Sequence, residues 1–96
     1  MNIGKALKQL RKERNVSQSD LFKLTNITQT SLSQIEKGTF MPTQKTIAKI
    51  CEALKINTAV VYLCAIEETD VPESKKEVYN LFYPQVKKMI ESIFTE

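Results

Sequence analysis

The sequence predicts an all-α protein. Apolar residues recur at three- and four-residue steps along nearly the whole chain, which is the period of an amphipathic helix. Residues that favour helix ends stand between these periodic stretches, and no stretch of useful length alternates apolar and polar residues as a strand would. We therefore expect a succession of short helices.

The first helix is expected at about residues 2–14. Asn15 suits its end, because asparagine tolerates the left-handed conformation that often terminates a helix. The second helix is expected at 17–24, where Ser17 and Asp20 match a short version of the capping box. The inner faces of these two helices are expected to carry Ile3, Leu7, Leu10, Leu21 and Leu24.

Three further helices follow. Thr28 caps the third, at about 28–36, and Gly38 ends it. Thr43 caps a fourth helix and Asn57 a short fifth one. Their inner faces are expected to carry Leu32, Ile35, Ile47, Ile50, Cys51, Leu54, Val60 and Val61.

The last part of the chain is expected to form a helical extension. The polar stretch EETDVPES is a connector, and Pro72 suits the first turn of a helix that begins near Glu73. Pro84 lies inside this helix and removes one backbone donor, so we expect a kink or a break near residues 82–83.

The length of 96 residues fits one domain with an appendage, which we place at residues 1–66 and 67–96. Cys51 and Cys64 lie in apolar patterns, so we interpret them as small core residues in a reducing compartment. No secretory signal and no membrane-spanning apolar run is present, and the expected location is the cytoplasm.

The composition argues against an enzyme. The chain has no histidine and only two glycines, so it offers neither a usual metal-ligand cluster nor a glycine-rich phosphate loop. We expect no metal and no cofactor. The charge is uneven: residues 1–50 carry nine Lys/Arg against three acidic residues, net +6, and residues 51–96 carry a net −3. The first half is the candidate for a polyanionic partner.

The two short helices at 17–24 and 28–36 are joined by a tight turn at which Asn26 suits positive φ, and this is a helix-turn-helix arrangement. The second helix of the pair is unusual, because its polar face is almost uncharged. Exposed helix faces normally carry Lys and Glu. A row of neutral amides and hydroxyls favours a partner that offers its own hydrogen-bonding groups. Those groups are Gln29, Thr30, Ser33 and Gln34.

The stretch SQSDLFKLTNITQTSLSQIEKG at residues 17–38, followed by Pro42, Thr43, Ala48 and Leu54, resembles the lambda-repressor-like (Cro/C1, XRE-type) DNA-binding family. The resemblance covers about residues 2–66. It implies a five-helix DNA-binding domain that places helix 28–36 in the major groove of double-stranded DNA.

By this resemblance, the four neutral polar residues Gln29, Thr30, Ser33 and Gln34 contact bases. The resemblance also implies phosphate contacts for Ser17, Gln18, Thr28, Lys37, Thr39, Thr43 and Lys45. It pairs Arg11 with Glu36 inside the domain. Phe22 departs from the alanine usual in the family, and it either points into a gap near the fifth helix or opens the helix pair.

The apolar side chains of the extension predict an interface. Left uncovered they would be a liability, so we expect them to fold back on the first and fifth helices or to pair with a second copy, and we favour a homodimer. The residues are Val78, Leu81, Phe82, Val86, Met89, Ile90, Ile93 and Phe94.

The predicted function is a sequence-specific transcriptional regulator, mostly a repressor, which binds a roughly palindromic operator as a homodimer. An antitoxin-type protein-binding module is the alternative. Its C-terminal segment would hold a partner protein, and its DNA binding would be secondary. Neither reading involves a membrane.

Overall fold

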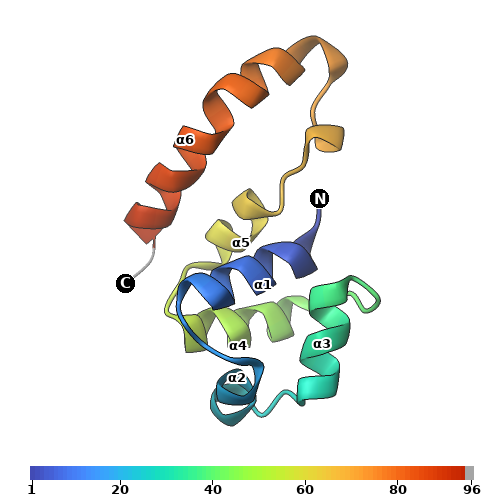
Figure 1. Ribbon diagram of the computed structural model, residues 1–96, viewed down its shortest axis with the longest axis vertical. Helices are drawn as coiled ribbons and strands as arrows, with labels where there is room; N and C mark the ends of the chain where they lie inside the picture. Colours follow the sequence, from blue (N-terminus) through green and yellow to red (C-terminus); the bar gives the residue numbers. More distant parts are fainter. Residues whose placement is uncertain (95–96) are drawn as a thin grey trace.

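The computed structural model describes residues 1–94 and confirms the all-α prediction. Over these residues the chain forms six α-helices and two short 3-10 helices, without a strand (Figure 1). The last two residues of the predicted extension lie outside the described range. The elements are α1 (Ile3–Glu13), α2 (Gln18–Thr25), α3 (Gln29–Lys37), α4 (Gln44–Leu54), α5 (Thr58–Cys64), η1 (Glu68–Asp70), η2 (Glu73–Lys75) and α6 (Lys76–Phe94).

Helices α1 to α5 begin within a residue or two of the predicted starts, because a side-chain oxygen is available for the unpaired amides of each first turn. Helix α6 begins at Lys76, after η2, rather than near Glu73 as predicted. Ser17 caps α2 in a reciprocal box with Asp20. Thr28 accepts from the Ser31 amide, and Thr43 and Asn57 cap α4 and α5 in the same way.

The helix ends also follow the sequence. Asn26 has a φ of 61° after α2, and Gly38 has a φ of 81° after α3. Asn15 adopts positive φ just beyond α1. These left-handed residues turn the chain sharply, so that α3 packs on both α1 and α2 over short connections.

One hydrophobic core joins α1 to α5. Val60 and Val61 are completely buried, so α5 lies at its centre. Most other core residues come from the predicted inner faces: Ile3, Leu7, Leu10, Leu21, Leu32, Ile35, Ile47, Ile50, Cys51 and Leu54. Ala6, Ile56 and Ala65 complete the core and were not predicted.

The prediction that Leu24 lies on the inner face of α2 is wrong. Leu24 is 62% exposed, and Thr25 takes the inner position one residue later. The Thr25 hydroxyl donates to the Leu21 carbonyl at 2.7 Å, so a polar residue is buried at small cost. In this eight-residue helix, Leu21 and Thr25 lie one turn apart and define the inner face, from which Leu24 is rotated away. Phe22 is 38% exposed and lies at the surface of α2, so the helix pair need not open to hold it.

A glycine sets how closely α1 approaches α3. A Cβ atom at Gly4 would collide with the Ile35 carbonyl oxygen and would also crowd the Glu36 carbonyl. Since both neighbours are backbone atoms of α3, they cannot rotate away as a side chain would. Gly4 therefore fixes the distance between the first helix and the helix that carries the neutral polar face.

The sequence predicted a kink or a break near residues 82–83, and the break does not occur, because α6 runs continuously through Pro84. Proline has a φ close to the helical value, so the helix can continue through it. It loses the hydrogen bond to the carbonyl four residues back, and the proline ring crowds that carbonyl. That carbonyl belongs to Asn80, which is exposed, so water can satisfy it.

The long helix α6 lies beside the five-helix body and packs mainly on α5 (Figure 1). The Tyr79 hydroxyl donates to the Ile66 carbonyl, and the Tyr83 hydroxyl donates to the Leu63 carbonyl. No helix of the described chain combines the length and apolar character that crossing a bilayer requires.

Candidate nucleic-acid interface

Two buried side chains hold α3 against the core. Leu32 is 1% exposed and Ile35 is 2% exposed. They lie three residues apart on one face, as an amphipathic helix requires. The opposite face of α3 therefore points away from the protein, with its direction fixed by the packed side.

The neutral polar residues are on that outer face. Gln29, Thr30 and Gln34 are exposed, and Ser33 is half-buried. None of the four side chains makes a hydrogen bond to any other residue among those that the structure describes. Their amides and hydroxyls are therefore available to an outside partner.

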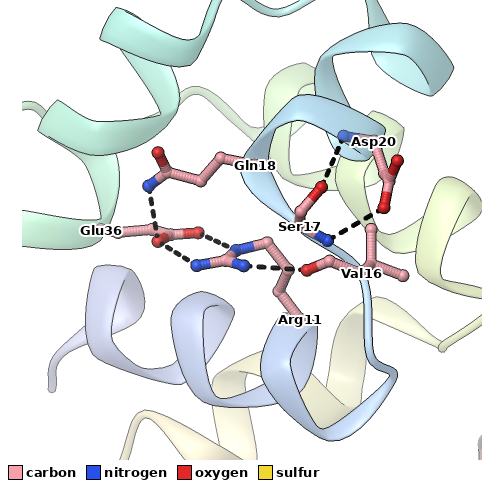
Figure 2. A network of polar contacts seen from close by, with 6 residues as sticks. All are labelled: Arg11, Val16, Ser17, Gln18, Asp20 and Glu36. Carbon is pink, nitrogen blue, oxygen red and sulfur yellow. Dashed lines mark hydrogen bonds and ion pairs between the residues drawn. The ribbon is translucent and has the colours of Figure 1, made fainter.

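An ion pair ties α1 to α3. Arg11 Nε lies 2.7 Å from Glu36 Oε2, and Arg11 Nη2 donates to Glu36 Oε1 at 2.9 Å (Figure 2). The two side chains are only 9% and 5% exposed. This two-point geometry matches the planar guanidinium to the carboxylate, so the rotation of α3 is fixed relative to α1.

The same pair reaches two further elements (Figure 2). Arg11 Nη1 donates to the Val16 carbonyl at 2.8 Å, which fixes the turn between α1 and α2. Gln18 Nε2 donates to Glu36 Oε1 at 3.1 Å, which joins the start of α2 to α3. One carboxylate thus aligns the three helices around the outer face of α3.

The protonation state of Glu36 favours this network. Burial alone would raise the pKa of the Glu36 carboxyl, but the hydrogen bonds from Arg11 and Gln18 and the charge of Arg11 outweigh it. The resulting pKa is below its ordinary value, so Glu36 is ionised at neutral pH and the network is complete.

The hydroxyls among the predicted phosphate contacts already have partners. Thr28 donates to Ser31 Oγ, Thr39 donates to the Gln34 carbonyl, and Thr43 donates to Thr46 Oγ1. Ser17 Oγ accepts the Asp20 amide. A phosphate at these places would therefore meet the neighbouring backbone amides more readily than the hydroxyls. The sequence predicted the capping roles of Ser17, Thr28 and Thr43, but not the bond made by Thr39.

The two lysines among the predicted phosphate contacts differ from these hydroxyls, because their side chains have no partner in the described chain. Lys37 ends α3 and Lys45 lies in the first turn of α4, and both are exposed. Neither forms a salt bridge within residues 1–94. Both charges are therefore uncompensated within this part of the chain.

Sequence reasoning missed an apolar feature beside this face. Phe40 and Met41, in the loop after α3, are 54% and 72% exposed. No periodic pattern marks them, because they lie outside a helix.

The residues of the predicted dimer interface separate into two groups. Ile90 is half-buried and packs against the chain's own core. The other seven side chains are 44–66% exposed. Phe94 belongs to these seven at 46%, although its backbone carbonyl accepts the Asn57 amide at 3.1 Å. The sequence pattern could not separate the groups, because all eight share helical spacing.

The sequence was compared with known proteins. The helix-turn-helix family profile matches residues 7–61, more than half of the chain. An immunity repressor protein of Bacillus phage phi105 is 28% identical over 93 residues, which cover 97% of this chain and 62% of that protein. The ImmF control region 10 kDa protein of the same phage is 29% identical over 65 residues, which cover 68% of this chain and 72% of that protein.

The chain thus spans less than two thirds of the immunity repressor's length. The profile match begins in α1, spans α2, the turn and α3, and ends in α5, so it includes the complete helix pair and its supports. The expected resemblance is confirmed, and the chain belongs to the lambda-repressor-like (Cro/C1, XRE-type) helix-turn-helix family of DNA-binding domains.

Proposed function

We propose that this protein is a sequence-specific transcriptional repressor that binds a two-fold symmetric operator as a homodimer. The observation that carries the proposal is the outer face of α3, where four neutral polar side chains have no partner in the described chain while the opposite face is packed. Family membership supports DNA as the ligand. The similarity to a protein named an immunity repressor supports repression.

The chemistry of α3 fits the major groove. A glutamine side-chain amide can donate to adenine N7 through its NH2 group and accept from the adenine N6 amino group through its oxygen. This two-point match distinguishes adenine from guanine, which offers acceptors at both positions. Gln29 and Gln34 are the candidates for such pairs. Thr30 and Ser33 can donate to or accept from a base, and the Thr30 methyl can meet the thymine methyl.

Groups around α3 would position the protein on the DNA duplex. Lys37 and Lys45 supply charge to phosphates, and the amides at the starts of α2, α3 and α4 supply donors. Phosphate contacts fix where the protein lies on the duplex but carry no base information. In a homodimer on DNA, the two copies of α3 would lie about 34 Å apart, one turn of the double helix. Occupation of promoter DNA in the cytoplasm would then block transcription.

Selection from random duplex DNA tests the proposal. We expect a recovered motif with two inverted half-sites about one helical turn apart. Recovery of DNA without a common motif would contradict base reading.

Salt dependence tests the phosphate contacts separately. Replacing Lys37 or Lys45 with Ala should reduce the slope of log affinity against log salt by about 1 each. Lys75→Ala is the matched control, because it removes the same charge from an exposed residue of η2, distant in sequence from α3. An unchanged slope in both lysine variants would remove these residues from the interface.

A partner-binding function is the second candidate, favoured by the exposed apolar side chains of α6. An antitoxin-type protein would use them to hold another protein. A neighbouring reading frame for a small toxic protein and a monomeric purified chain would support this function over the repressor.

A further inference from the structure

Helix α6 has two distinct faces. One contacts the chain's own body: besides Tyr79 and Tyr83, Lys87 Nζ donates to Gln9 Oε1 at 3.3 Å. Glu91 Oε1 accepts the Cys64 thiol at 3.0 Å. These residues recur at four-residue steps, so they form a single row along the helix.

The second face is apolar and uncovered. We call it the α6 stripe, and it consists of Val78, Leu81, Phe82, Val86, Met89 and Ile93. These side chains are 44–66% exposed. Helical geometry centres the stripe roughly a quarter turn around the axis from the Tyr79–Tyr83 row, with Val86 and Ile93 at the edge nearer that row. The body of the same chain therefore cannot cover it while those hydrogen bonds are made.

The size of the α6 stripe fits a dimer interface. An aromatic side chain has roughly 150–250 Å² of surface and the other side chains of the stripe have less, so six that are about half exposed present on the order of 400–500 Å². Each partner contributes roughly 800 Å² to a standard interface. Monomers rarely expose so large a contiguous apolar patch unless it binds something.

We propose that the α6 stripe packs antiparallel against the α6 stripe of a second copy of this chain, with the two-fold axis passing between Gln85 and Val86. The inference deepens the proposed function, since it names the surface that joins the two DNA-binding units. The pairing of the two α6 helices can be tested without DNA.

The sequence of the stripe supports the antiparallel direction. Val78 and Ile93 lie equally far from the Gln85–Val86 bond, and so do Phe82 and Met89. An antiparallel pair centred there places Val78 opposite Ile93 and Phe82 opposite Met89, twice each. In an antiparallel pair the positive end of each helix dipole lies beside the negative end of the other, which is favourable. In a parallel pair, ends of like sign lie together.

Engineered cysteines test the pairing and its direction. The native thiols are poor reactants, because burial raises the pKa of Cys51 to about 11 and that of Cys64 to about 12. Under mild oxidation we expect Gln85→Cys, next to the proposed axis, to form a disulfide-linked dimer. Asn80→Cys is the control, because Asn80 is exposed outside the α6 stripe.

The ends of the stripe decide the direction. We expect Val78→Cys and Ile93→Cys to form few dimers alone and to cross-link to one another when the two variants are mixed. A parallel pair would instead link each variant to itself, and this result would overturn the proposed direction. Failure of Gln85→Cys to cross-link above the Asn80→Cys control would overturn the pairing.

Light scattering gives a second measurement. The wild-type chain should be a dimer without DNA, and the double variant Phe82→Glu/Met89→Glu should be a monomer with an unchanged helical circular dichroism spectrum. Asn80→Glu should stay dimeric. A monomeric wild-type chain at tens of micromolar would overturn the inference. A dimer that selects no DNA motif would leave the inference standing and contradict the proposed function instead.

Discussion

Helices α3 and α6 both expose side chains that the described chain does not use, but they are held in different ways. α3 buries Leu32 and Ile35 almost completely, and the Arg11–Glu36 pair fixes its rotation. No residue of α6 is fully buried, and hydrogen bonds at its tyrosines, Lys87 and Glu91 hold it to the body. The outer face of α3 is therefore a preformed surface. The apolar side chains of α6, in contrast, would become buried only against a partner.

This difference matches the chemistry of the two exposed faces. Base recognition needs donors and acceptors at fixed positions, so a rigid support improves discrimination. An apolar interface depends mainly on the area removed from water and tolerates adjustment.

The largest effect is expected from Arg11→Met. This variant leaves the Glu36 carboxylate buried without its cation, which should cost about 3–5 kcal/mol of unfolding free energy. Urea denaturation followed by circular dichroism would measure it.

The double variant Arg11→Met/Glu36→Leu is the matched control. With both charges removed, most of the stability should return, because the desolvation of an unpaired ion is avoided. A single variant as stable as wild type would show that the pair does not support α3.

The close approach at Gly4 gives the next largest effect. Gly4→Ala should destabilise by about 1–3 kcal/mol, because α1 must move away from the α3 backbone. Gly38→Ala is the comparison: a Cβ there meets nothing within 4 Å, and only the φ of +81° is strained. We expect thermal unfolding to show the larger loss for Gly4→Ala, and the reverse order would contradict the proposed role of Gly4.

A smaller, local effect is expected at α6. Tyr83→Phe removes the hydrogen bond to the Leu63 carbonyl and should loosen α6 by about 0.5–1.5 kcal/mol. Amide hydrogen exchange should accelerate in α6 and stay unchanged in α3. Equal acceleration in both helices would show that they form one cooperative unit.

Low pH should weaken the Arg11–Glu36 ion pair that holds α3 against α1. The pKa of Glu36 is lower in the folded chain than in the unfolded one, so its contribution to stability is complete at neutral pH. That contribution should begin to fall near the unfolded value of about 4.3 and be lost as the pH drops through the folded value. The Arg11→Met/Glu36→Leu variant should lose less stability over the same range in denaturation measurements. Identical pH profiles for the two proteins would contradict this role of Glu36.

Local features were predictable from the sequence. Ser17, Thr28, Thr43 and Asn57 cap helices because each needs only the amides of its own first turn. Asn26 and Gly38 end helices for equally local reasons. The outward face of α3 followed because Leu32 and Ile35 define its buried side.

Features that depend on distant contacts were not predictable in this way. Which residue of α2 turns inward depends on how the helix is rotated against the core, and Thr25 replaced Leu24 there. The apolar spacing of α6 did not show that Ile90 faces the body while Met89 faces outward. The bonds from Tyr79 and Tyr83 to α5 and the residues after it decide this, and they join residues far apart in the sequence.

The most direct test of the central claim is the base preference of Gln29→Ala, measured position by position over a library of operator variants and compared with that of wild type. If α3 reads bases, the variant should lose about 1–3 kcal/mol of discrimination at one base pair in each half-site and keep its preferences elsewhere. A loss of affinity that is uniform across all sequences would contradict the claim.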